Sequence, residues 1–137
     1  MRIMTEPCFL DSNVLIYAAL VPDRRSDAAR ALLVQRHTIS VQVLNEFADV
    51  ARRRLQRPWD EIEQALADIR TLCASVLPIT MATHESALKI AARTGYQFYD
   101  ALILASALEV GCTTLYSEDL PDGQRIEGRL VIRNPFR

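Results

Sequence analysis

The sequence has little cysteine and no long uncharged hydrophobic run, and these shortages exclude two classes of protein. Its three cysteines, Cys8, Cys73 and Cys112, lie far apart without CxxC or Cys/His spacing. We therefore expect buried free thiols, and neither a zinc site nor a disulfide framework. Asp100 and Glu109 interrupt the most apolar region, so no run reaches the roughly 18 residues of a membrane span. Residues 1–9 lack the apolar core of a signal peptide, which predicts a cytoplasmic protein.

An excess of charge of one sign is also absent. The 137 residues include 16 basic and 17 acidic side chains, which argues against a passive nucleic-acid coat protein. Half of the residues are hydrophobic and 24% are charged, as in an ordinary folded domain, so disorder is excluded. We expect one domain over residues 1–137. The two histidines, His37 and His84, stand in polar surroundings and are predicted to lie on the surface.

Short apolar runs alternate along the chain with longer amphipathic stretches. The pattern predicts strands at 8–10, 38–40, 76–79, 113–116 and 130–133, and helices over 13–20, 26–35, 43–55, 58–73, 80–94 and 99–110. Ser40 is the expected N-cap of the third helix, and Thr80 or Thr83 that of the fifth, which Gly95 ends. Strands that alternate with helices predict an α/β fold in which a parallel sheet is covered on both faces.

Four carboxylates fall where the strands of such a sheet end. Asp11 directly follows the first strand, Glu46 lies in the helix after the second, Asp100 opens the last helix, and Asp119 follows the fourth strand. Because ligands bind at the carboxyl ends of parallel strands, these side chains are candidates for one site.

Each of these residues also has a purely structural interpretation. Asp11 can cap the helix that follows it, Glu46 can border the core as a solvated side chain, and Asp119 can serve a turn beside Pro121. Asp100 is harder to explain in this way, because its neighbours in sequence are apolar and none is Lys or Arg. A carboxylate in such a helix is unfavourable unless a cation or hydrogen bonds compensate its charge.

A metal ion is the simplest compensation for four clustered carboxylates. Oxygen ligands favour hard ions, here Mg²⁺ or Mn²⁺. The sequence has no P-loop, no GxGxxG, no Ser/His/Asp set and no candidate catalytic cysteine. The remaining chemistry is metal-dependent hydrolysis of a phosphate ester, because a bound ion activates water and stabilises a charged phosphoryl oxygen.

At these residues the sequence resembles PIN-domain proteins, and most closely the VapC-type toxins of type II toxin–antitoxin systems. The resemblance covers nearly the whole chain. It rests on four fragments that occur in order: Phe-Leu-Asp-Ser-Asn-Val-Leu-Ile-Tyr at 9–17, Asn-Glu-Phe at 45–47, Tyr-Asp-Ala-Leu-Ile-Leu-Ala at 99–105, and Leu-Tyr-Ser-Glu-Asp at 115–119. Each fragment is weak alone, and together they are specific.

The resemblance implies a three-layer α/β/α sandwich with a parallel sheet of order 3-2-1-4-5. It implies a Mg²⁺- or Mn²⁺-dependent endoribonuclease, a homodimer that a small antitoxin inhibits, with no membrane attachment. Asp11, Glu46, Asp100 and Asp119 match the family's catalytic and metal-binding acidic residues. Asn13 and Ser117 match its supporting polar residues. Glu118 and Asp122 are close enough in sequence to take the role of Asp119.

Two surfaces suit the implied partners. Arg52, Arg53 and Arg54 end one helix and are candidates for binding RNA phosphates, although arginines also favour helix C-termini through the helix dipole. An apolar helix of an antitoxin fits a groove lined by exposed members of the set Leu15, Ile16, Leu32, Leu33, Trp59 and Ile62.

Three alternatives remain beside the toxin. One is a PIN-fold binding protein without turnover, and another is DNA flap cleavage, for which the chain has no room for large insertions. The third is a phosphorylated receiver module, but that fold needs an aspartate after the third strand, where Pro78-Ile79-Thr80 stand. It also needs a lysine after the fifth strand, and the only lysine is Lys89, within a helix.

Overall fold

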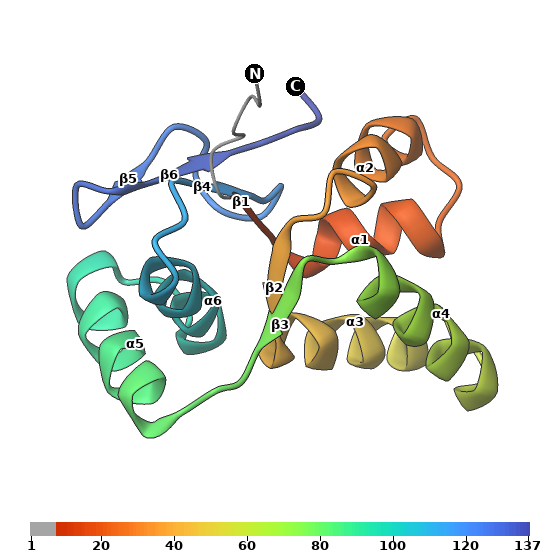
Figure 1. Ribbon diagram of the computed structural model, residues 1–137, viewed down its shortest axis with the longest axis horizontal. Coiled ribbons are helices and arrows are strands. Elements are labelled where there is room, and N and C mark those ends of the chain that lie inside the picture. The colour runs from red at the N-terminus through yellow and green to blue at the C-terminus, as the bar shows by residue number, and fades with distance from the viewer. Residues whose placement is uncertain (1–7) are drawn as a thin grey trace, which may run out of the picture.

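A central sheet of short strands is covered by helices on both faces, with α5 and α6 on one side and α1 to α4 on the other (Figure 1). This computed structural model describes residues 8–137. The strands are β1 (Cys8–Leu10), β2 (Thr38–Ser40), β3 (Ser75–Leu77), β4 (Thr114–Tyr116), β5 (Arg125–Ile126) and β6 (Leu130–Arg133). The helices are α1 (Ser12–Ala19), α2 (Ser26–Leu33), α3 (Val41–Arg53), α4 (Trp59–Leu72), α5 (Met81–Thr94) and α6 (Phe98–Glu109). The α/β prediction is confirmed.

The strand order is β3-β2-β1-β4-β6-β5. All neighbouring strands are parallel except β5, which runs antiparallel to β6. The predicted order 3-2-1-4-5 is confirmed, because the predicted fifth strand at 130–133 is β6 and pairs with β4. The two-residue edge strand β5 was not predicted; Gly128, at φ 68°, lies in the turn that folds it back onto β6.

The order of the strands creates a crevice at one place in the sheet. From β1 the chain adds β2 and then β3 on one side, and then crosses over to place β4 on the other side of β1. Strand order therefore reverses between β1 and β4, which is where open α/β sheets bind ligands, outside the carboxyl ends of the strands. Segments 11–13 and 117–119 follow these two strands.

Helix ends match the capping residues expected from the sequence. The Ser40 side chain accepts from the backbone N–H of Val43. Thr80 is the N-cap of α5 and forms a capping box with Thr83, so of the two predicted candidates Thr80 is the cap. Gly95 ends α5 at φ 77°, a conformation that glycine adopts without strain. Pro58 is the residue before α4 and not part of its first turn.

Helix α6 lies in the centre of the core. Its residues from Ala101 to Ala107 are all buried, and it packs against α5, α3 and β2. Burial on all sides explains why this helix is apolar throughout. Asp100, in its first turn, is therefore held by a helix whose centre is fully buried.

Two predictions about exposure need correction. His37 is only 6% exposed, because it lies beside β2 with its ring 6.0 Å from that of Tyr116, whereas His84 is exposed as predicted. None of the three cysteines forms a disulfide; Cys73 and Cys112 are buried as predicted, whereas Cys8 is only half-buried. None of the helices within residues 8–137 combines the length and apolar character that a membrane crossing requires.

Most of the residues named for the groove of a partner helix are less exposed than that role requires. Leu15, Ile16, Leu33 and Ile62 are buried in the core, so only Trp59 and the half-buried Leu32 present surface. Helical periodicity marks an apolar face, but it does not tell whether that face packs on the sheet or faces a partner.

Candidate active site

The register of β1 and β4 brings the first two predicted site segments together. Leu10 is paired with Tyr116, and the backbone N–H of Asp11 donates to the Tyr116 carbonyl at 3.0 Å. Asp11 and Ser117 therefore leave neighbouring strands side by side. The Ser117 Oγ donates to Asp11 Oδ2 at 2.7 Å, although the two residues lie 106 positions apart in the chain.

Asp11 is both a helix cap and a member of this cluster, so its two interpretations hold together. Its Oδ1 accepts from the Ser12 N–H at 2.7 Å, and its Oδ2 also accepts from Asn13 Nδ2 at 3.3 Å. The side chain is buried, with 2% exposed, and burial raises its pKa to about 7. The hydroxyl of Ser117 lowers the pKa, and the nearby charges of Glu46 and Asp100 raise it further.

Asn13 and Ser117 connect the two segments, as the predicted supporting residues should. Asn13 Nδ2 donates to Asp119 Oδ2 at 3.2 Å, and Asn13 Oδ1 accepts from the Glu118 N–H at 3.2 Å. The Ser117 Oγ accepts from the Asp119 N–H at 3.1 Å. These bonds fix the backbone of 117–119 against α1, and with it the position of the Asp119 carboxylate.

Glu46 reaches the same cluster from α3. Its Oε1 accepts from the Ser12 Oγ and its Oε2 from the Gln42 Nε2, both at 3.2 Å. Burial raises its pKa, hydrogen bonds from these two residues lower it, and the charges of Asp100 and Asp119 raise it again. Ser12 and Gln42 were not singled out from the sequence, although Gln42 lies one helical turn before Glu46 on the same face.

Asp100 completes the cluster without a partner. Within residues 8–137, no group donates a hydrogen bond to its carboxylate or forms an ion pair with it. It is half-buried, and burial, followed by the charge of Asp119, raises its pKa. None of these residues therefore compensates its charge, and a bound cation as its partner stays a prediction.

These side chains lie around a cavity of about 1010 Å³, which is lined by residues including Ser12, Gln42, Asn45, Glu46, Asp49, Arg54, Tyr96, Gln97, Tyr99, Asp100 and Asp119. Asp49, three residues after Glu46, adds a further acid that was not predicted for the site. The structure thus brings Glu46, Asp100 and Asp119 onto one cavity, with Asp11 buried beside them.

The two residues considered as substitutes for Asp119 have other contacts. Glu118 accepts hydrogen bonds from the Tyr17 hydroxyl at 2.8 Å and from Arg25, with which it forms an ion pair. Asp122 accepts from the backbone N–H of Asn134 at 2.8 Å. Neither lines the cavity, so the geometry favours Asp119.

The family model of the PIN domain matches residues 8–120, a span that contains every residue of this cluster. The chain belongs to the PIN domain family. At the level of the family this supports a nuclease, and PIN-domain nucleases generally use divalent metal ions. No curated protein sequence matches the chain significantly.

Solved structures of the same fold are similar over nearly the whole length of this PIN domain. VapC20 of Mycobacterium tuberculosis, a toxin that cleaves the sarcin–ricin loop, is 24% identical over 82% of this chain and 89% of its own, with a TM-score of 0.68. A toxin–antitoxin complex from Klebsiella pneumoniae is 21% identical over 93% and 97%, with a TM-score of 0.69. DNA-bound VapBC from Salmonella typhimurium is 22% identical over 96% and 99%, with a TM-score of 0.64. These likenesses show the fold.

The donor set of the PIN domain fits a hard cation, although the carboxylates are not gathered tightly around one point. No group of three or more Asp, Glu, His or Cys side chains in the described part of the chain lies close enough together to hold a metal ion. Mg²⁺ usually keeps several water ligands and takes only one or two carboxylates, so a looser cluster suffices for it. Asp100 has no partner, and the pKa values of Asp11 and Glu46 are raised. A bound cation would pair with Asp100 and lower the pKa values of all three carboxyl groups.

The three predicted RNA-binding arginines point to different surroundings. Arg52 lies over the Trp59 ring at 5.1 Å and donates to the Arg57 carbonyl, and Arg53 pairs with Asp49 at 3.5 Å. Only Arg54 lines the acidic cavity, and its guanidinium has no partner among the described residues.

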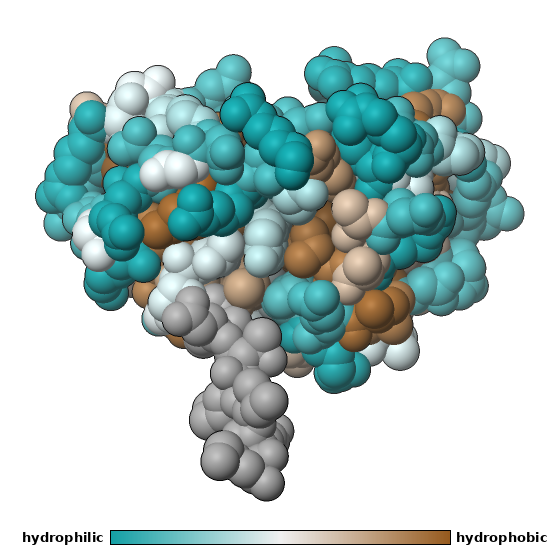
Figure 2. Space-filling model, turned by 90° about the horizontal axis from the view of Figure 1, so that it is seen from above, coloured by the Kyte–Doolittle hydropathy of each residue, from teal (hydrophilic) through white to brown (hydrophobic). Residues whose placement is uncertain are grey.

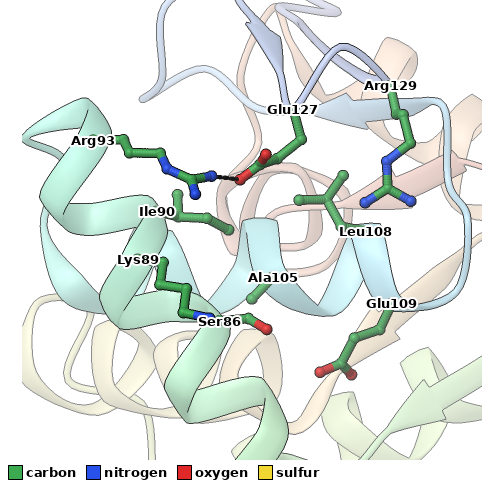
Figure 3. Close-up of a pocket in the computed structure, with 9 residues that line it drawn as sticks. All are labelled: Ser86, Lys89, Ile90, Arg93, Ala105, Leu108, Glu109, Glu127 and Arg129. Atoms are coloured by element: carbon green, nitrogen blue, oxygen red, sulfur yellow. Dashed lines mark hydrogen bonds and ion pairs between the residues drawn. The ribbon is translucent and has the colours of Figure 1, made fainter.

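A second cavity, of about 350 Å³, lies away from this cluster between α5, α6 and the β5–β6 hairpin. Figure 3 shows Lys89 and Arg93 reaching into it from α5 and Arg129 from the turn between the strands, with an ion pair between Arg93 and Glu127. None of the predicted site residues lines it, and its acids do not converge with those of the cluster.

Proposed function

We propose that this single PIN-like domain is a Mg²⁺- or Mn²⁺-dependent endoribonuclease and the toxin half of a type II toxin–antitoxin pair, acting in the cytoplasm. One observation carries the catalytic part: Asp100 is a half-buried carboxylate without a partner in residues 8–137, and it lines one cavity with Glu46 and Asp119, beside the buried Asp11. Membership of the PIN family supports the nuclease chemistry.

The ion would lie among Asp11, Glu46, Asp100 and Asp119, with one or two of these carboxylates binding it directly and the others acting through its water ligands. When bound, a divalent ion lowers the pKa of a coordinated water and stabilises charge on a phosphoryl oxygen. The chain's own residues supply the positioning. Asn13 and Ser117 orient Asp11 and Asp119, while Ser12 and Gln42 orient Glu46, all by uncharged hydrogen-bond donors.

RNA cleavage tests this proposal. Purified protein is incubated with total RNA in Mg²⁺, in Mn²⁺ and in chelator, beside Asp100→Asn and the exposed control Glu63→Gln. We expect cleavage by the wild type and the control only with the metal, and none by Asp100→Asn. Cleavage in chelator, or full activity of Asp100→Asn, would refute the proposed mechanism. Absence of cleavage by the wild type would favour the PIN-fold binding protein.

The toxin role rests on the likeness to toxin–antitoxin structures and on a surface that suits a partner. A groove of about 290 Å³ between α1, α2 and α4 is lined mainly by small and apolar residues, among them Ala18, Leu33 and Ile69. Val34, which also lines it, is 63% exposed. Hydrophobic residues visible in Figure 2 gather mainly on the side on which α2 lies in Figure 1. An apolar antitoxin helix fits this groove.

Co-expression tests the toxin role. The chain expressed alone should stop growth, and the small neighbouring reading frame should restore it and copurify with the chain. A Val34→Glu variant should remain toxic but escape this rescue, because a charge in the groove opposes an apolar helix. A harmless wild type without a copurifying partner would leave only the nuclease.

A homodimer belongs to the same proposal. Met81 and Leu88 on α5 are 70% and 50% exposed, and apolar side chains on one helix suit a contact between two copies. Light scattering during gel filtration should give twice the monomer mass, and a Met81→Glu, Leu88→Glu variant should give the monomer mass.

A further inference from the structure

The acidic cavity contains an aromatic ring that none of the interactions in the cluster explains. Tyr99 precedes Asp100 in α6, lines the cavity and is 61% exposed. Its ring meets that of Phe98 in an edge contact at 6.0 Å. Trp59, the other strongly exposed aromatic side chain of residues 8–137, is covered by Arg52, whereas Tyr99 has no cation over its ring. A large π-surface is therefore open beside the carboxylate that carries the proposed function.

Two side-chain amides without hydrogen-bond partners among the described residues line the same cavity. Asn45 of α3 and Gln97, directly before α6, both line it, and both are exposed. Neither side-chain amide has a hydrogen-bond partner in the part of the chain that the structure describes. An amide offers both a donor and an acceptor, which is the combination that reads the edge of a nucleobase.

The volume of the cavity is large enough to admit a nucleotide. At about 1010 Å³ it is as large as the sites that bind drug-sized ligands. Asp11 and Asp100 are buried or half-buried, so a phosphodiester must enter the recess to reach them. RNA-binding proteins commonly take unpaired bases in this way, by stacking them on aromatic side chains and contacting their edges.

We infer that Tyr99 is the stacking platform of a nucleobase subsite in this cavity, with Asn45 and Gln97 contacting the edge of the base. This deepens the proposed function, on which it rests, because it makes single-stranded RNA with an unstacked base the substrate. Stacking positions the neighbouring phosphodiester at Asp100, the next residue in the same helix.

Binding of intact and base-free RNA tests the subsite. The probes are a short single-stranded RNA of mixed sequence and the same backbone with abasic nucleotides, titrated by fluorescence anisotropy with Ca²⁺ in place of Mg²⁺. We expect Tyr99→Ala to bind the intact RNA about 5-fold to 150-fold more weakly and to bind the abasic strand like the wild type. Tyr99→Phe should keep most of the affinity, because the ring remains.

The matched control is Trp59→Ala, which removes an equally exposed aromatic ring outside the cavity and should leave both affinities unchanged. Equal losses for both strands in Tyr99→Ala would mean a general structural role and would overturn the inference. Unchanged binding of the intact strand would overturn it too, and so would a defect confined to antitoxin binding.

The two proposals fail separately. If the wild type cleaves RNA with Mg²⁺ but does not distinguish the two strands through Tyr99, only the subsite is refuted. If the wild type distinguishes them through Tyr99 but cleaves nothing, only the nuclease is refuted.

Discussion

Replacing Asp11 by asparagine should stabilise the protein in a strongly pH-dependent way. In the folded state the pKa of Asp11 is about 7, against an ordinary value of 3.8, because the side chain is buried. The folded protein therefore binds this proton more tightly than the unfolded chain. The resulting stabilisation is complete below about pH 4 and is lost as the pH rises through about 7.

The size of the effect follows from the shift. A pKa raised from 3.8 to about 7 corresponds to about 4 kcal/mol in full, and about 2 to 3 kcal/mol of it falls between about pH 5 and pH 8. Asparagine has only one acceptor oxygen, so it cannot accept both from the Ser12 N–H at the position of Oδ1 and from Ser117 and Asn13 at the position of Oδ2, which costs about 1 to 3 kcal/mol at every pH. The difference between the two pH values is free of that constant cost.

The assay is urea unfolding followed by far-UV circular dichroism, in chelator, at about pH 5 and about pH 8. We expect the gain of Asp11→Asn over the wild type to be about 2 to 3 kcal/mol larger at the higher pH. Glu63→Gln, which removes an exposed carboxylate from α4, should follow the wild type at both. If the free energy of unfolding changes equally with pH in Asp11→Asn and in the wild type, the pKa of Asp11 is not raised by burial, and the reasoning is refuted.

Three further predictions concern the metal, the fourth acid and the basic residues. Mg²⁺ or Mn²⁺ should raise the Tm of the wild type in a thermal shift measurement and leave Asp100→Asn unchanged; equal shifts would place the ion elsewhere. Asp119→Asn should abolish RNA cleavage and Glu118→Gln should keep most of it, because Glu118 binds Tyr17 of α1 and Arg25 of the loop that follows. If Glu118→Gln loses more activity than Asp119→Asn in a cleavage assay, Glu118 is the fourth acid. Arg54→Ala should flatten the log–log salt dependence of RNA binding by about 0.7, and Arg53→Ala should not; equal slopes would contradict a phosphate contact at Arg54.

The α/β class and most element bounds were predictable because local signals agree with the tertiary structure, whereas the strand order was expected only from the resemblance to PIN-domain proteins. Ser40, Thr80 and Gly95 mark helix ends through bonds and dihedral angles that depend only on a few neighbouring residues. Strand β5 carries no such signal, since its two residues pair only after β6 is in place. His37 is similar, because a residue far along the chain, Tyr116, helps to cover it.

Within the site, sequence identified the acids but not the surroundings of each. Consecutive residues on a helix are turned by about 100°, so Arg52, Arg53 and Arg54 face three directions, and only the placement of α3 decides which one meets the cavity. Asp119 was the predicted fourth acid, but its sequence neighbour Glu118 was close enough to take its role. Their difference comes from Arg25, which lies 93 positions from Glu118 and forms an ion pair with it.

The hydrogen bonds of the acidic cluster leave its charge uncompensated, and this is the strongest structural argument for a cation. Ser12, Asn13, Gln42 and Ser117 hold the carboxylates of the cluster, and all four are uncharged donors. An arginine in their place would orient a carboxylate equally well, but it would neutralise it, as Arg25 does for Glu118 outside the cavity. Neutral donors fix the geometry while repulsion and burial keep the pKa values raised. A site built in this way is unfavourable to folding by itself and gains most from an ion that binds it.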